Sequence, residues 1–254
     1  MNQNLLENIR IVLVEPAGEL NLGSIARVMK NMGLTKLVLV NPKCDRDSES
    51  ARIMAVHAVD VLENARIVND LPAALVGCQQ AIATTVRSRS VPIVLETPQV
   101  LASSLASNVQ SALLFGAEER GLSNDELKYA QRFICIPSNP DYPSLNLAQA
   151  VAICAYELYQ ASLKIENNSS SLPPVNSQPI TAPQPTNAPI EVLEGYYQDL
   201  ETLLLEIGYL YPHTAAVKME KFRRLHNKAN LQSEEVAMLR GILRQIRWAN
   251  RARS

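Results

Sequence analysis

The chain has 254 residues, 47% of them hydrophobic, and a formal net charge of −1 at pH 7, so it can form a packed core and is long enough for one large and one small domain. No apolar run approaches the roughly 20 residues that span a bilayer, and the polar start lacks the apolar stretch of a signal peptide, so we expect a cytoplasmic protein without a membrane segment. Four cysteines and three histidines lie apart without paired spacing, which argues against a disulfide framework and predicts no zinc or other metal site.

Short apolar runs in the first part of the chain predict buried strands of one sheet. The runs are Ile9–Val14, Leu37–Val40, Ala81–Val86, Ala112–Phe115 and Phe133–Ile136. Between the first two, apolar residues recur at helical spacing, with Asn21 as the expected helix cap and Gly33 as the expected end. A strand, a helix and a strand in this order indicate an α/β fold with a mostly parallel sheet and helices on both faces.

A second helical pattern follows the last of these runs and closes the first domain. It includes Leu147, Val151 and Leu158, and we expect it to end near Lys164. Residues 167–189 are rich in Ser, Pro and Asn and nearly free of charged and large apolar side chains, so they predict a flexible linker. The expected organisation is a domain of residues 1–166, a linker of residues 167–189 and a domain of residues 190–254.

The last part of the chain predicts a small, basic, all-helical domain. Apolar residues from Val192 to Ile207 trace one helix stripe, and two further helices are expected at Ala215–Lys228 and Ser233–Trp248. Residues 211–254 contain 10 Lys and Arg against 3 Asp and Glu, whereas the rest of the chain contains 14 against 22. A basic tail on an acidic body is compatible with a nucleic-acid ligand despite the nearly neutral total.

Three loops carry the residues that could do chemistry. Each comes directly after a predicted strand, where open α/β sheets bind their ligands. They are Glu15–Arg27 (EPAGELNLGSIAR), Phe115–Ser123 (FGAEERGLS) and Ile136–Asn146 (IPSNPDYPSLN). No G-x-G-x-x-G follows a strand and no Walker-type motif is present, which argues against Rossmann dehydrogenases and P-loop NTPases. These patterns predict a ligand site at the strand ends and leave its reaction open.

The three loops, in this order, resemble the motifs of a known family. NLGSIAR, FGAEERGLS and IPSNPDYPSLNLAQAVAICAYEL resemble the three motifs of the TrmH-like branch of the SPOUT methyltransferases. TVRSRS at residues 85–90 and the tail segment LRGILRQIRWANR are similar to the TrmJ-type tRNA methyltransferases of that branch. The resemblance covers residues 9–164 and, less sharply, the tail. It implies S-adenosyl-L-methionine (SAM) as cofactor, a homodimer, and a trefoil knot in residues 81–164 of the α/β domain.

The resemblance also implies roles for single residues. Arg27 of one subunit would approach the cofactor of the other and act as the catalytic residue, with Asn21 and Ser144 in the same centre. Because a guanidinium barely deprotonates, we expect Arg27 to stabilise the developing ribose alkoxide or to hold the adjacent phosphate. Glu118 would be structural or direct, for example by accepting backbone N–H groups. The cofactor would be bound by Thr84, Thr85, Val86, Gly116, Ile136, Ser144, Leu145 and Asn146. RNA would be contacted by Arg87, Arg89 and Arg120.

The activity implied is SAM-dependent 2′-O-methylation of a pyrimidine ribose in the tRNA anticodon loop, of the position 32 type. Two alternatives stay open: a related ribose methyltransferase acting on ribosomal RNA, and a noncatalytic RNA-binding relative. Ala117 departs from the pattern, since TrmJ-type relatives often carry an arginine there, which puts the substrate contacts in doubt. The tail would grip tRNA phosphates or complete the dimer, unless its charges form an ordinary solvated helix face. The tail residues concerned are Lys218, Lys221, Arg223, Arg224 and Lys228.

Overall fold

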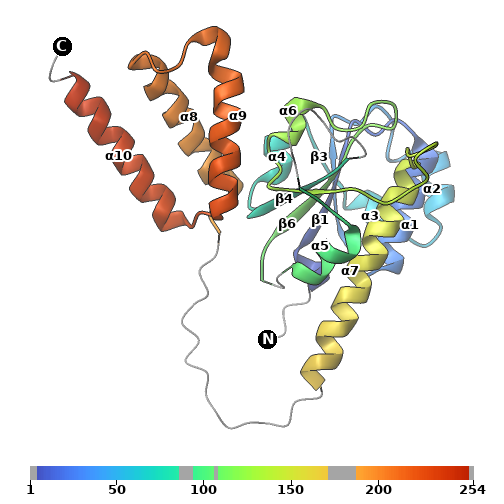
Figure 1. Cartoon of the computed structure of the whole chain (residues 1–254). Helices are drawn as coiled ribbons and strands as arrows, with labels where there is room; N and C mark the ends of the chain where they lie inside the picture. Colours follow the sequence, from blue (N-terminus) through green and yellow to red (C-terminus); the bar gives the residue numbers. More distant parts are fainter. Residues whose placement is uncertain (1–4, 86–93, 106–107, 171–186, 252–254) are drawn as a thin grey trace.

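The computed structural model describes residues 5–85, 94–105, 108–170 and 187–251, which form an α/β domain followed by a helical domain (Figure 1). Within these residues the α/β domain contains one seven-stranded sheet in the order β3-β2-β1-β6-β4-β7-β5, and all neighbouring strands are parallel. The predicted α/β class with a mostly parallel sheet is confirmed. The strands are β1 (Ile9–Val14), β2 (Lys36–Val40), β3 (Arg66–Val68), β4 (Gln80–Thr84), β5 (Leu95–Glu96), β6 (Ser111–Phe115) and β7 (Arg132–Ile134).

Two strands, β3 and β5, were missed by the sequence pattern because they lie at the two edges of the sheet. An edge strand is partly solvated, so it needs no continuous apolar run. β3 has the sequence RIV with two exposed residues, and β5 has only two residues. The five predicted strands are the interior ones, and their apolar runs match the buried interior of the sheet.

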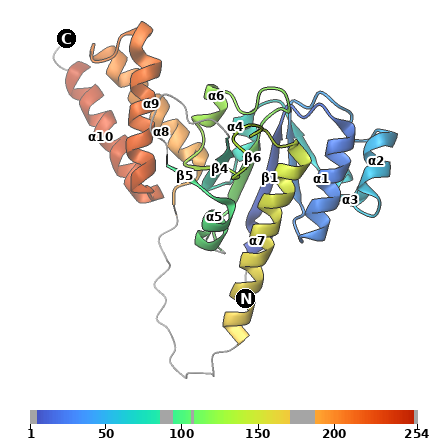
Figure 2. The same cartoon turned by 45° about the vertical axis from the view of Figure 1, so that its right-hand side comes forward.

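Alternate residues of β1 pack on opposite faces of the sheet, as the two-residue period of a strand requires. Ile11 and Leu13 join one core with α1, α5 and α7, whereas Val12 and Val14 join a second core with α4 and α6. Figures 1 and 2 show these two layers of helices with the sheet between them. The helices of this domain are the 3-10 turn η1 (Leu5–Asn8), α1 (Glu19–Asn31), α2 (Glu49–Ala55), α3 (Val59–Glu63), α4 (Leu71–Leu75), α5 (Pro98–Ser104), α6 (Asn124–Leu127) and α7 (Leu147–Ser170).

Helix α1 ends as the sequence predicts but begins elsewhere. Gly33 has a φ of +69°, and the N–H after it donates to Met29 O at 2.8 Å, which is a glycine-terminated helix end. The predicted cap at Asn21 is wrong, because α1 begins at Glu19 and its N-cap is Gly18. The side-chain amide of Asn21 instead forms hydrogen bonds with residues that are far away in the sequence.

The helical domain contains the three helices expected from the sequence: α8 (Ile190–Glu206), α9 (Pro212–Ala229) and α10 (Ser233–Arg251). Helix α7 extends beyond Lys164 to Ser170, since the chain has neither Gly nor Pro in this stretch before Pro173. Of the predicted linker, residues 167–170 belong to α7, residues 171–186 lie outside the described part of the chain, and residues 187–189 lead into α8. Within that last piece Ala188 is fully buried against the helical domain.

The two domains meet where α8 begins. Ile190 is 3% exposed and packs in the same core as Leu75 and Cys78 of the α/β domain. Its N–H donates to Cys78 O at 2.9 Å, and the carboxylate of Glu191 accepts the N–H of Gly77 at 3.3 Å. The joint lies just before β4, so the helical domain is attached at the opposite end of that strand from the motif loops.

The predicted trefoil knot would lie in residues 81–164, and residues 86–93 and 106–107 of this stretch are outside the described part of the chain. The knot therefore stays a prediction. None of the described helices is long and apolar enough to cross a membrane.

Candidate active site

A pocket of about 350 Å³ opens at the carboxyl ends of β4, β6 and β7, where two of the motif loops meet. This volume is within the range of small-molecule sites. Of the eight residues expected to bind cofactor, six line the pocket: Thr84, Thr85, Gly116, Ile136, Ser144 and Leu145. The seventh, Asn146, adjoins the lining at the start of α7. The eighth, Val86, lies outside the described residues, as do the predicted RNA contacts Arg87 and Arg89.

The pocket combines hydrogen-bonding backbone with an apolar wall. At its β4 side the Thr84 hydroxyl donates to Leu114 O at 2.9 Å, and the Thr85 N–H donates to Ile134 O at 2.9 Å, which fixes the strand end. The apolar lining consists of Phe115, Ala117, Leu122, Ile134, Ile136, Pro143, Leu145, Leu147 and Ala150. Such a wall can hold a flat ring system, while the loop backbone offers donors and acceptors at its edge.

The loop of residues 116–122, which we call the lining loop, folds back on itself at the mouth of the pocket. A Cβ at Gly116 would lie 2.1 Å from Gly121 C and 2.2 Å from Leu122 N, so no other residue fits there without moving the backbone. Gly121 has a φ of +69°, and its N–H donates to Ala117 O at 2.8 Å. The conformation of the loop therefore requires both glycines. Without side chains at these positions, the loop backbone can line the pocket.

One carboxylate joins all three motifs. Glu118 accepts hydrogen bonds at 3.1 Å from the N–H groups of Ala17 and Gly18 and from the side-chain amide of Asn21. The oxygen of the same Asn21 amide accepts a hydrogen bond from Asn146 Nδ2 at 2.9 Å. Asn21 was expected in the catalytic centre and Asn146 at the cofactor, and the structure joins the two by this direct hydrogen bond, while Glu118 holds the other end of the Asn21 amide.

Several donors keep Glu118 ionised. Burial alone would raise its pKa, but hydrogen bonds from its own N–H, from Asn21 and from the N–H groups of Ala17 and Gly18 outweigh that effect and lower the pKa of Glu118 below its ordinary value. A carboxylate at the first turn of α1 also interacts favourably with the helix dipole. Gly18 leaves room for this arrangement, since a Cβ there would lie 2.8 Å from Asn21 Nδ2.

Asn146 has a second role at the start of α7. Its side-chain oxygen accepts the N–H of Ala148 at 2.9 Å, which is the bond of a helix cap. The capping role and the link to Asn21 thus coexist on one side chain. Ser144 lines the pocket two residues earlier and is exposed to solvent.

Arg27, the expected catalytic residue, is not part of this pocket within one chain. It is exposed on α1, and no hydrogen bond or ion pair holds it among the described residues. Leu20, two turns earlier on the same helix, is 58% exposed, and Ile153 and Tyr156 on the neighbouring α7 are 38% and 49% exposed. In a single copy Arg27 is therefore exposed and outside the pocket lining, and exposed apolar residues are present on both its own helix and the neighbouring one.

Arg120, which was expected to contact RNA, forms ion pairs with two carboxylates of its own chain. Its Nη2 lies 2.7 Å from Glu15 Oε2 and 2.8 Å from Glu126 Oε1. Neither glutamate was singled out from the sequence. Glu15 directly follows the first apolar run, and Glu126 completes the S-x-x-E capping signature of Ser123–Glu126, so both signals were available.

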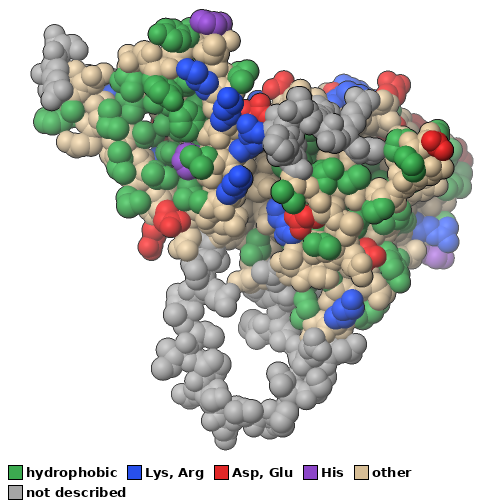
Figure 3. Space-filling view, in the orientation of Figure 1, with side chains coloured by type: hydrophobic (Ala, Val, Ile, Leu, Met, Phe, Trp, Pro, Cys, Tyr) green, Lys and Arg blue, Asp and Glu red, His purple; other side chains and the backbone are tan. Residues whose placement is uncertain are grey.

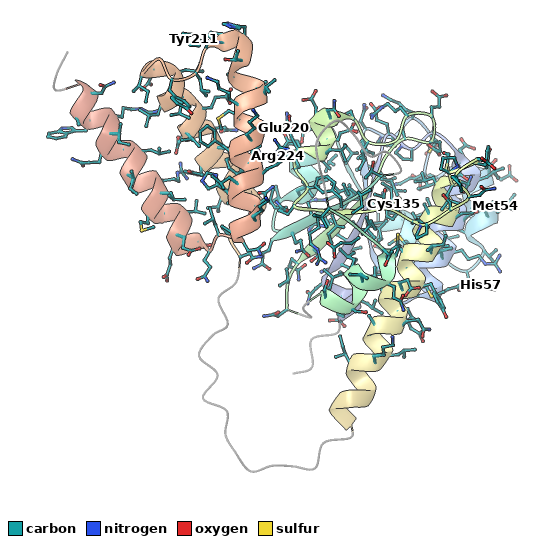
Figure 4. The ribbon with its side chains drawn as sticks, viewed as in Figure 1. Met54, His57, Cys135, Tyr211, Glu220 and Arg224 are labelled. Carbon is teal, nitrogen blue, oxygen red and sulfur yellow. The ribbon has the colours of Figure 1, made fainter. Side chains whose placement is uncertain are left out.

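Of the five basic residues expected to make contacts, Lys218 donates to Tyr209 O at 3.2 Å, and the other four divide into two groups. Lys221, Arg224 and Lys228 lie on one side of α9, where Figure 3 shows a row of Lys and Arg next to the α/β domain, and Figure 4 shows Arg224 on that side. Arg223 is different, because it forms a bidentate ion pair with Glu194 and stacks over the Tyr197 ring at 4.4 Å. Among the five basic residues expected to make contacts, Arg223 therefore stabilises the helical domain itself through Glu194 and Tyr197.

Comparison with known proteins assigns the family. The model of the SpoU rRNA methylase family matches residues 8–156, and the model of the C-terminal domain of the tRNA methyltransferase TrmJ matches residues 191–254. The parallel sheet, the pocket at its carboxyl edge and the first of these matches define the α/β domain as a methylase of the SpoU family.

Relatives with both domains narrow this class. The tRNA (cytidine/uridine-2'-O-)-methyltransferase TrmJ of Pectobacterium atrosepticum is 42% identical, over 95% of this chain and 98% of its own. The crystal structure of TrmJ from Z. mobilis ZM4 has a TM-score of 0.78 at 34% identity and covers 94% of this chain and 98% of its own. A structure described for 2-OH methylation of C/U34 on tRNA has a TM-score of 0.50 at 27% identity, over 61% of this chain and 97% of its own. The chain belongs to the TrmJ family of SpoU methylases.

Proposed function

We propose that this protein transfers a methyl group from SAM to the ribose 2′-hydroxyl of a pyrimidine at position 32 in the anticodon loop of tRNA. The observation that carries the proposal is the hydrogen-bonded unit of Asn21, Glu118 and Asn146, one residue from each motif, beside the pocket that Gly116 and Glu118 line. The name of the Pectobacterium relative, a tRNA cytidine/uridine 2′-O-methyltransferase, supports both the reaction and the RNA.

The residues at the pocket fit SAM. Its purine suits the apolar wall around Ile136 and Leu145, and its ribose and amino-acid groups suit the exposed backbone of the lining loop. When bound, SAM supplies an electrophilic methyl group on a sulfonium. The chain's own contribution is to hold the ribose hydroxyl in line with that group, and positioning alone can supply much of the acceleration.

Arg27 completes the site from a second copy of the chain. Leu20 on the same helix and Ile153 and Tyr156 on the neighbouring α7 are exposed apolar residues, and exposed apolar side chains favour packing against a second copy. In that homodimer the Arg27 guanidinium of one subunit stabilises the oxygen that develops negative charge in the other subunit's pocket. The role needs a fixed positive charge and no deprotonation, which suits arginine.

The row of basic residues on α9 binds the tRNA backbone. Lys221, Arg224 and Lys228 can each neutralise a phosphate, so the affinity for tRNA should fall as salt rises. These contacts carry no sequence information, so the choice of nucleotide rests with the pocket. The match to the TrmJ C-terminal domain favours tRNA over ribosomal RNA as the substrate.

The test is methyl transfer from labelled SAM to bulk tRNA by the wild type, Arg27→Ala and Lys30→Ala. Lys30 is a matched control, because it is an exposed cation on the same helix and pairs with Asp60 at 2.7 Å. We expect Arg27→Ala to bind SAM normally and to lose at least about 100-fold in turnover, as removal of one stabilising donor does elsewhere. Lys30→Ala should retain the wild-type rate. SAM binding without any transfer to RNA by the wild type would support the noncatalytic alternative instead.

A further inference from the structure

The Arg120 side chain is 40% exposed, but its guanidinium hydrogen-bonds to groups of its own chain. Nη1 donates to Glu126 Oε2 at 2.9 Å and to Gly121 O at 2.9 Å, while Nη2 donates to Glu126 Oε1 at 2.8 Å and to Glu15 Oε2 at 2.7 Å. Two carboxylates and one carbonyl thus accept hydrogen bonds from both terminal nitrogens of the guanidinium. Fork-shaped pairs of this kind fix geometry better than any single contact, because two parallel hydrogen bonds define the plane of the guanidinium.

Glu15 is anchored at the carboxyl edge of the sheet. Its backbone N–H donates to Val40 O at 2.8 Å, and its second carboxylate oxygen accepts the amide of Asn41 at 2.9 Å. Both residues have positive φ, +50° for Glu15 and +45° for Asn41, which is uncommon for non-glycine residues. Such backbone persists where surrounding contacts fix it, and it often lies at functional sites. The carboxylate is therefore tied to the ends of both β1 and β2.

Glu126 is anchored in α6. Its carboxylate accepts the N–H of Ser123 at 2.6 Å, and the Ser123 hydroxyl accepts the N–H of Glu126 at 3.2 Å, so the two form a capping box. Its side chain is 17% exposed. Burial raises the pKa of Glu126, but the hydrogen bonds from Arg120 and Ser123 outweigh it and keep the pKa below its ordinary value. The pKa of Glu15 is lowered chiefly by its hydrogen bond from Arg120.

The lining loop is consequently pinned at two points to the segment that follows β1. Glu118 holds the N–H groups of Ala17 and Gly18, and Arg120, two residues later, holds Glu15. These two points lie within the segment from Gly116 to Leu122, all of which lines the pocket. Without Arg120, only the Glu118 contact would tie the loop to this segment among the interactions described.

We propose that Glu15, Arg120 and Glu126 form a clamp that holds the lining loop in the position that binds the cofactor. Arg120 is then a positioning residue and contacts no RNA phosphate. This inference rests on the proposed function, since it concerns the SAM pocket, and it names residues that act on cofactor affinity without touching the reacting atoms.

The test is calorimetric titration of SAM into the full-length wild type, Arg120→Met, Glu15→Gln and the double variant. Methionine keeps an extended apolar chain without donors, and glutamine keeps the shape of glutamate without its charge. We expect the Kd for SAM to rise about tenfold in each single variant and no further in the double variant, because both changes open the same link. Arg247→Met is the control, since it breaks a 3.1 Å ion pair with Glu206 in the helical domain and should leave SAM affinity unchanged.

Steady-state kinetics and tRNA binding separate a clamp from the other roles. In Arg120→Met the KM for SAM should rise about as much as the Kd, while kcat at saturating SAM stays within about threefold of wild type. Affinity for tRNA without SAM should not change. A variant that loses tRNA affinity but keeps SAM affinity would overturn the clamp and restore Arg120 as an RNA contact. If Arg120→Met fails to fold, Glu15→Gln carries the same comparison.

Two further outcomes distinguish this inference from the proposed function. Normal SAM affinity in Glu15→Gln and Arg120→Met, beside a wild type that binds and transfers the methyl group, would overturn the clamp alone. A wild type that binds no SAM would overturn the proposed function and the clamp with it. An equal loss of affinity in Arg247→Met would show a general effect of lost ion pairs, which also overturns the clamp.

Discussion

Glu118 shows how much of this site depends on one side chain. Its two oxygens receive two backbone N–H groups and the Asn21 amide, and through Asn21 it reaches Asn146 at the start of α7. The partners are about a hundred positions away in the sequence, so no local pattern could show that they meet. The sequence suggested a structural or a direct role for Glu118, and the observed contacts are those of a structural tie.

Glu118→Gln should weaken folding measurably. The amide NH₂ of glutamine would face N–H donors, which leaves at least one of them without an acceptor, so we expect the free energy of unfolding to fall by about 1–3 kcal/mol. Urea denaturation measures this loss. Glu119→Gln is the control, because Glu119 is the exposed neighbour of Glu118 and should change stability by less than about 0.5 kcal/mol.

Stability should also depend on pH through these carboxylates. The pKa values of Glu15, Glu118 and Glu126 lie below the ordinary 4.5 in the folded chain. The unfolded chain therefore takes up protons first, so their contribution to stability is present above pH 4.5 and is lost as pH falls through the folded-state pKa. Urea unfolding from pH 6 to 3.5 should show this decline, with a smaller slope in Glu118→Gln than in the wild type. Identical slopes would contradict the assignment.

At the scale of elements, the lining loop is a tight turn that depends on its first glycine. Gly116→Ala would place a Cβ about 2 Å from backbone atoms of Gly121 and Leu122, and since backbone cannot rotate out of the way, the loop must move. We expect SAM affinity to fall at least about tenfold and thermal stability to drop. The control is Gly241→Ala on α10, where nothing lies within 4 Å. Because alanine is the better helix former, that change should stabilise the protein by up to about 1 kcal/mol without affecting SAM affinity.

The strands that could be predicted from the sequence are those that are buried and therefore contain a continuous run of apolar residues. The interior strands β1, β2, β4, β6 and β7 have apolar runs, whereas the edge strands β3 and β5 do not and were missed. The pocket-lining residues were found through the family motifs, because these lie at strand ends. The ion pair of Arg120 with Glu15 joins positions that are 105 apart in the sequence. It depends on the register of β1 beside β6, which no local sequence pattern indicates.

For the whole molecule, the separation of Arg27 from the pocket within one chain is the feature with the largest consequence. If a second copy supplies Arg27, mixed dimers of Arg27→Ala and Gly116→Ala should regain activity at a SAM concentration that is too low to occupy the Gly116→Ala pocket. An Arg27→Ala subunit keeps an intact pocket, and a Gly116→Ala subunit keeps an intact Arg27, so each mixed dimer contains one complete site. An equal mixture that exchanges subunits should reach about one quarter of wild-type activity. No recovery after verified exchange would place Arg27 and the pocket in the same subunit or remove Arg27 from catalysis.

The identity of the methylated nucleotide tests the proposed function most directly. Unmodified tRNA would be incubated with SAM and the full-length protein, digested to nucleosides and to oligonucleotides, and mapped by mass spectrometry. We expect a 2′-O-methylated pyrimidine at position 32 with the wild type and none with Arg27→Ala. A methyl group at position 34, as in the C/U34 methylation described for one structural relative, would keep the reaction but change the site. A methyl group on a base, or on ribosomal RNA alone, would show that the protein is not a tRNA ribose methyltransferase.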